Sequence, residues 1–155
     1  MAVTASGLFL TTWADIVDTT QLAIDLDLET HKGALFTDTV TPNFNTDTAY
    51  GVAPYNANEV ISAGPWPTGG VVLVGTTVDI TTTSGTLIFD ATDVSVAATT
   101  LTNAKCYLLY ADVLAGDRAI VLVNFGANFS TVNGTFGIQW AAPGSGGVFN
   151  IDLTP

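Results

Sequence analysis

One cysteine and one histidine are the side chains best suited to nucleophilic catalysis in this sequence, and there is only one of each. Cys106 lies in an apolar stretch, and His31 stands beside Lys32 in a polar junction. A nucleophile needs a base, normally a histidine, so a Cys106–His31 pair is the one dyad available. Cysteines inside strands usually act as small hydrophobic residues, and we expect this of Cys106. Zinc needs three or four ligands, which one cysteine and one histidine supply poorly.

Carboxylates are the one plentiful functional group. The acids that stand close together in the sequence are Asp25, Asp27 and Glu29, then Asp90 with Asp93, and Asp112 with Asp117. Calcium takes about six to eight oxygen ligands, but no D-x-[DN]-x-[DN]-G loop is present. Glycoside hydrolysis needs a carboxylate pair in a cleft, and no spacing here marks such a pair. We interpret these acids as solvated turn residues and predict no catalytic residue, no metal site and no cofactor, so the chain is not expected to be an enzyme.

The charge balance restricts the class of partner. Fourteen acids face three bases, which gives a formal net charge of −11. The bases, Lys32, Lys105 and Arg118, are scattered and cannot form the basic stripe that binds a phosphate backbone or an anionic membrane. No run of about 18 apolar residues occurs, so no transmembrane helix is expected. No basic residue precedes Lys32, so a secretory signal is not expected either. We predict no nucleic-acid partner and no membrane partner.

A single domain over residues 1–155 is expected from this length. An arm, residues 1–10, precedes the one segment whose apolar spacing predicts a helix, residues 11–18, and Thr11 or Thr12 can cap it. Apolar and acidic residues then alternate over 24–28, which predicts a strand with one wet face, although a helix remains an alternative there.

Residues 38–67 read as a long loop, because they are rich in Thr, Asn, Asp and Gly and contain four prolines. One short helical or extended element is expected near 58–61. The aromatic residues of the loop are Phe44, Tyr50, Tyr55 and Trp66. Aromatic rings on a loop stiffened by proline suit an interface, so we predict that these four residues bind a partner, together with the arm. The alternative is that the rings cap the chain's own core.

Short strands separated by turn residues dominate the rest of the chain. The predicted strands are 33–37, 71–80, 86–90, 94–96, 105–112, 117–125, 129–131, 135–140 and 148–153. Asn133-Gly134 is the strongest hairpin signal, because both residues tolerate positive φ. This spacing is typical of an antiparallel β-sandwich or a partly closed barrel, here with one short N-terminal helix and a long proline-rich loop.

Six segments occur in an order that is similar to a known family. They are 34–45 (ALFTDTVTPNFN), 68–70 (TGG), 88–95 (IFDATDVS), 104–110 (AKCYLLY), 124–126 (NFG) and 133–140 (NGTFGIQW). Together they resemble the small virion structural proteins of tailed bacteriophages, over about residues 31–153. The sequence departs from the family pattern at 63–67 and carries an insertion at 144–147. Both departures fall in loops, and therefore bear on partner contacts rather than on the fold.

The resemblance implies a structural protein of a phage particle, most simply a capsid decoration (cement) protein on the capsid surface of the virion, made in the bacterial host cytoplasm. The partners that it implies are the major capsid protein and further copies of the chain. A homotrimer is expected, because a trimer matches the local threefold points of a capsid. The alternatives are a tail or connector component, and a carbohydrate-binding module of a host-recognition appendage, which Trp66 and the polar loop suggest.

Overall fold

The computed structural model describes residues 3–27 and 30–154, and its secondary structure is mostly β. Strands hold 45% of the residues and helices 7%. In chain order the elements are β1 (Gly7–Leu8), α1 (Leu10–Val17), β2 (His31–Phe36), β3 (Glu59–Val60), β4 (Val71–Leu73), β5 (Thr77–Asp79), β6 (Thr86–Asp90), β7 (Val94–Ala111), β8 (Arg118–Ile138), a 3₁₀ turn (Pro143–Ser145) and β9 (Phe149–Asp152). The predicted antiparallel β fold with a short N-terminal helix is therefore confirmed.

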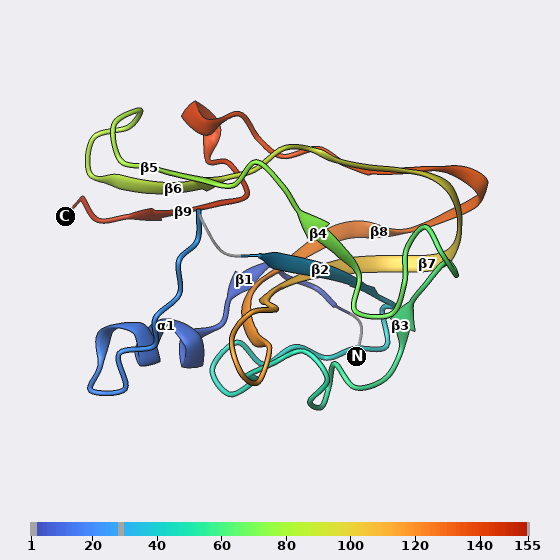
Figure 1. The fold of residues 1–155 in the computed structure, drawn as a ribbon, viewed down its shortest axis with the longest axis horizontal. Coiled ribbons are helices and arrows are strands. Elements are labelled where there is room, and N and C mark those ends of the chain that lie inside the picture. Colours follow the sequence, from blue (N-terminus) through green and yellow to red (C-terminus); the bar gives the residue numbers. More distant parts are fainter. Residues whose placement is uncertain (1–2, 28–29, 155) are drawn as a thin grey trace.

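The strands form two sheets, and Figure 1 shows the smaller one above and to the left of the larger one. The larger sheet has the order β1-β8-β7-β2-β3, and β4 also pairs with β2. The smaller sheet has the order β5-β6-β9. Every pairing is antiparallel, and the sheets do not close into a barrel. Of the two predicted forms, the sandwich is thus the one adopted. Within the described residues, no helix has both the length and the apolar character that a membrane crossing requires.

One long hairpin, β7–β8, belongs to the large sheet and folds back over it. Its pairing runs from Ala111↔Arg118 in the large sheet to Val94↔Ile138 at its other end, and four register shifts interrupt it between Val96 and Cys106. Figure 1 shows the hairpin curving around one end of the molecule and returning above the large sheet. Bulges bend and twist a strand pair in this way.

The predicted hairpin at Asn133-Gly134 is wrong. Asn133 does adopt a positive φ of 45°, but it lies inside β8 at the bend, where the neighbouring Gly134 pairs with Thr99. The strands predicted separately at 94–96 and 105–112 are parts of β7, and those at 117–125, 129–131 and 135–140 are largely parts of β8. The Asn133-Gly134 pair therefore marks an irregularity inside the continuous strand β8, and not a turn between two strands.

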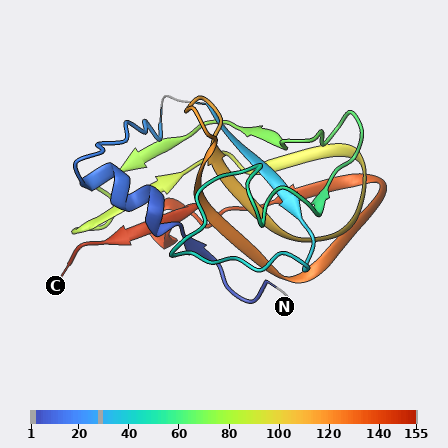
Figure 2. The same cartoon turned by 90° about the horizontal axis from the view of Figure 1, so that it is seen from below.

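Apolar side chains cover both faces of the large sheet, which explains its long apolar runs. Along β7, Tyr107 and Leu109 face the core between the two sheets, whereas Leu108 and Tyr110 face a second core on the opposite side. This alternation follows from the period of two in a strand. The second core is closed by the N-terminal arm and the long loop, as Figure 2 shows from below.

Two predicted strands differ in the structure. Residues 21–25 have no regular structure and 26–27 form a turn; Leu28 lies outside the described residues. The edges of β2 are occupied by β7 on one side and by β3 and β4 on the other, so no described strand pairs with residues 21–27. The strand predicted at 71–80 is split into β4 and β5. The break contains Gly75, whose φ of 65° takes the chain from one sheet to the other.

The helix begins one residue earlier than predicted, and Phe9 rather than a threonine occupies the N-cap position, without a side-chain cap. Thr12 is buried and donates a hydrogen bond to the carbonyl oxygen of Ala119 on β8, at 2.6 Å. Asp15 pairs with Arg118. These contacts fix α1 beside the start of β8.

Candidate interaction surfaces

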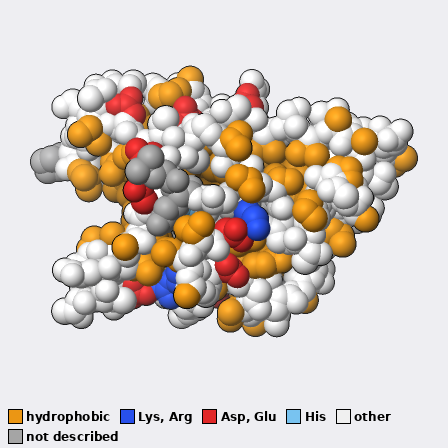
Figure 3. Space-filling view, viewed as in Figure 1, with side chains coloured by type: hydrophobic (Ala, Val, Ile, Leu, Met, Phe, Trp, Pro, Cys, Tyr) orange, Lys and Arg blue, Asp and Glu red, His pale blue; other side chains and the backbone are white. Residues whose placement is uncertain are grey.

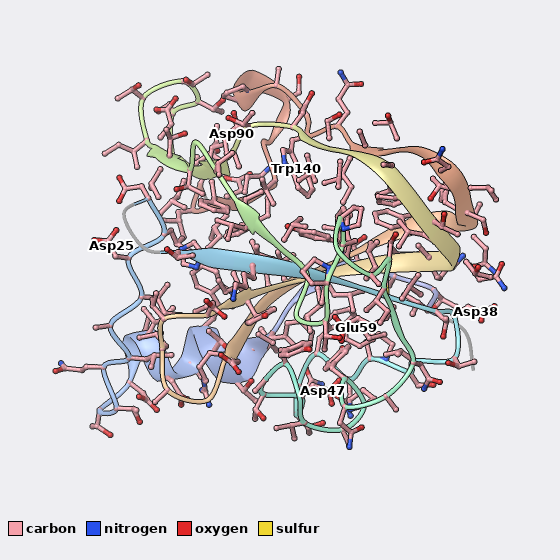
Figure 4. All side chains as sticks on the ribbon, turned by 45° about the vertical axis from the view of Figure 1, so that its right-hand side comes forward. Asp25, Asp38, Asp47, Glu59, Asp90 and Trp140 are labelled. Carbon is pink, nitrogen blue, oxygen red and sulfur yellow. The ribbon has the colours of Figure 1, made fainter. Side chains whose placement is uncertain are left out.

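The predicted acidic groups do not form one cluster. Figure 4 shows Asp25, Asp38 and Asp90 on separate parts of the molecule. Asp25 and Asp27 do interact, and the side-chain hydrogen bond between them raises the pKa of Asp27. Among the described residues, no group of three His, Cys, Asp or Glu side chains is placed to hold a metal ion.

Asp112 and Asp117 flank the turn between β7 and β8. Asp112 pairs with Lys32 at 2.9 Å, and burial together with the Asp112 charge raises the pKa of Asp117. The two acids flank a turn, as predicted, and they lie close enough to interact; a lysine balances one of them.

Cys106 and His31 are held apart by the β2–β7 ladder. Cys106 pairs with Phe36 at one end of this ladder and His31 with Ala111 at the other. Five residues of strand separate the two positions by about 16 Å. Both side chains are fully buried, and burial raises the pKa of the Cys106 thiol to about 12. The Cys106–His31 dyad is therefore not formed.

The four aromatic residues predicted to bind a partner pack against the chain itself. Trp66 and Tyr55 are 0% and 2% exposed, while Phe44 and Tyr50 are partly buried. Trp66 meets the ring of Phe136 edge-on at 5.5 Å. An indole without exposed surface offers no stacking platform for a sugar. Partner binding by the four stays a prediction, and Tyr55 and Trp66 could contribute to it only through the loop that they anchor.

Glu59 on β3 ties the long loop to the large sheet. Its carboxylate accepts hydrogen bonds from the hydroxyl of Tyr50 (3.0 Å) and from the backbone N–H of Gly69 (2.7 Å). Tyr110 stacks on Tyr50 at 4.6 Å and donates to the carbonyl oxygen of Gly69. Burial, followed by the neighbouring carboxylate, raises the pKa of Tyr50 to about 12. This network could not be predicted from the sequence, where Glu59 is a single acid in a loop with four prolines. The short element predicted near 58–61 does contain β3.

A cleft of about 480 Å³ lies inside the bend of β8; we call it the β8 cleft. Its aromatic lining is Phe125, Phe129, Phe136 and Trp140. Phe129 is 48% exposed, and nearby Val132 is 86% exposed. β1 pairs with β8 only at Val121 and Leu122, so among the described residues no strand pairs with the outer edge of β8 beyond them. The β8 cleft therefore lies beside a part of the β8 edge that no described strand covers.

A second hollow, the α1–β9 groove, separates the helix from the small sheet. It encloses about 640 Å³ and is lined by Trp13, Ile16 and Val17 of α1 and by Leu87, Ile151 and Leu153 of the small sheet and its C-terminal continuation. Figure 3 shows the molecule hollowed between these two parts, with apolar side chains gathered at the opening. Its lining is almost entirely apolar. Neither hollow was predicted from the sequence, because one depends on how sharply β8 bends and the other on how far α1 lies from the small sheet.

The three basic side chains are all engaged. Lys32 pairs with Asp112 and Arg118 with Asp15, while Lys105 donates to the carbonyl oxygen of Gly126 at 2.8 Å. The charge that the described surface offers to a partner is therefore predominantly negative.

No protein-family model, curated protein or solved structure matches the chain.

Proposed function

We propose that this chain is a structural protein of a tailed-phage particle, most simply a capsid decoration protein that binds the assembled lattice of major capsid protein as a trimer. The sequence resemblance supplies the virion context. A protein of this kind stabilises the lattice by mass action, because it binds the assembled shell and not the free subunits.

The observation that carries the proposal is the outer edge of β8. Between Val123 and Trp140 the chain contains no Asp, Glu, Lys, Arg or Pro. Edge strands are commonly protected by charges or prolines, since an unprotected edge pairs with other chains. Here the unprotected edge also carries the half-exposed ring of Phe129, which lines the β8 cleft, and the exposed side chain of Val132. Such an edge suits a subunit whose edges are covered by neighbouring copies.

The test is the mass of the purified chain in solution, measured by size-exclusion chromatography with light scattering. We expect three times the 16.0 kDa chain mass for the natural sequence. Val132→Asp should shift the mass to one chain, because the charge would be buried against a neighbour. Val113→Asp is the matched control: Val113 is also exposed but lies at the opposite end of the hairpin, and this variant should remain a trimer. A single-chain mass for the natural sequence would contradict the trimer.

Copy number in purified particles that contain the chain tests the place in the virion. Hundreds of copies per particle are expected of a decoration protein. A ring of about six to twelve copies would assign the chain to the tail or connector instead. Binding of the purified chain to host glycans would favour the carbohydrate-binding alternative.

A further inference from the structure

The α1–β9 groove combines an apolar slot with an open strand edge. In the order β5-β6-β9, β9 is an edge strand, and no described strand pairs with its other side. The backbone N–H of Leu153 donates a hydrogen bond to the carbonyl oxygen of Gly85, which immediately precedes β6. Because donors alternate along an antiparallel strand, the N–H and C=O groups of Asp152 and Asn150 face the free side.

Three apolar side chains on the walls of the groove are exposed to solvent. Val17 on α1 is 83% exposed and Leu153 beyond β9 is 73% exposed, while Leu10 at the start of α1 is 55% exposed. Their side chains stand on both sides of the slot. An extended segment that added to β9 could place its inward side chains between these walls, as in peptide recognition by strand addition between a sheet edge and a helix.

The acidic residues near the groove determine which kind of peptide segment would bind there. Exposed acids border the groove without lining it: Asp18 follows Val17 at the end of α1, and Asp152 lies between Ile151 and Leu153, with its side chain on the opposite face of β9. Hydrogen bonds from Thr154 lower the pKa of Asp152 below its ordinary value. A second copy of a chain with net charge −11 would bring its own acids to this edge. Like charges placed together oppose that pairing, whereas basic residues on the segment would favour binding.

We propose that the α1–β9 groove binds an extended segment of a different protein, with apolar side chains at alternate positions and Lys or Arg residues at its ends. The segment adds to β9 as a new edge strand, and its inward side chains fill the slot against α1. This site is separate from the β8 edge, and it does not depend on the virion assignment.

In the test, the full chain is titrated into a fluorescein-labelled peptide of alternating valine and threonine with two lysines at each end. Binding is measured by fluorescence anisotropy. We expect saturable binding that is about tenfold or more tighter than for the same peptide with glutamates at its ends. Replacing the threonines by proline removes backbone donors and should abolish binding. Equal binding of the lysine-flanked, glutamate-flanked and proline peptides would overturn the proposal, as would no binding of any of them.

Matched variants locate the site. Val17→Ser should weaken binding of the lysine-flanked peptide about tenfold, because one branched side chain no longer contributes apolar surface. Val132→Ser is the control, since Val132 is similarly exposed at 86% but lies on β8; it should bind as the natural chain does. Asp152→Asn should reduce the preference for lysine over glutamate ends. Unchanged binding by Val17→Ser, at an unchanged melting temperature, would show that the peptide does not enter the groove.

If Val132→Asp dissociates the trimer without affecting peptide binding, the two sites act independently.

Discussion

Replacement of Trp66 by alanine is the sharpest test of how the long loop is used. The indole is 0% exposed and packs on Phe136, and the backbone of Trp66 exchanges two hydrogen bonds of 2.8 Å with Ser62. Truncation of a buried tryptophan leaves a cavity and costs about 3–5 kcal/mol. For a chain of this size each kcal/mol lowers the melting temperature by about 2–4 °C. We therefore expect Trp66→Ala to melt roughly 6–20 °C below the natural chain.

Two further substitutions make the result specific to packing. Trp66→Phe should lose much less stability, since it retains an aromatic ring and the Nε1 atom of Trp66 has no hydrogen-bond partner among the described residues. Phe44→Ala should cost less than Trp66→Ala, because Phe44 is only partly buried. Thermal unfolding followed by circular dichroism, with urea unfolding as a check, measures all three variants in the isolated chain.

An unchanged melting temperature for Trp66→Ala would refute this reasoning. If that variant also lost its binding to particles, the ring would belong to an interface, as predicted from the proline-rich loop. A large fall in melting temperature would instead establish that the ring supports the sandwich core and that loop contacts with a partner, where they exist, are made by other atoms.

Two further predictions concern the buried ladder between β2 and β7. A Cβ atom added at Gly33 would lie 1.7 Å from Cζ of the buried Tyr107 ring, so Gly33→Ala should destabilise the chain by about 3 kcal/mol or more in urea unfolding. Gly137→Ala, whose nearest contact would be 3.5 Å from Val94, should cost little; equal losses for both would show that the close approach is not the cause. Cys106, with its pKa raised to about 12 by burial, should react with an aromatic disulfide reagent at pH 8 only after unfolding, and rapid reaction of the folded chain would contradict its burial.

Local patterns were sufficient to predict the fold class and several elements. β6 was predicted with its observed bounds, Thr86–Asp90, because apolar residues there are bounded by a Ser-Gly turn and by polar residues. β2 and α1 were predicted to within a few residues. These elements depend on periodicity and turn residues, which are properties of a few neighbouring positions.

The errors arose where distant segments decide the outcome. The long β8 strand could not be distinguished from several short ones, because its bulges contain the same Asn and Gly residues that end strands elsewhere. The alternation at 24–28 predicted a strand, but a strand also needs a free edge to pair with, and the sequence does not reveal which edges are occupied. The loop aromatic residues were recognised as important, while the second face of the sheet that Tyr55 covers was not foreseen.

The open edges of β8 and β9 differ in charge, and we therefore expect them to bind different kinds of partner. A chain with a net charge of −11 resists self-association in general, so copies should meet where the surface is free of charge. The outer edge of β8 from Val123 to Trp140 meets that condition, whereas β9 carries Asp152 beside its open edge. We therefore expect added salt to affect the two contacts in opposite directions. Screening should weaken binding of the lysine-flanked peptide to the α1–β9 groove, and should leave the association of copies through β8 unchanged or strengthen it by reducing their mutual repulsion.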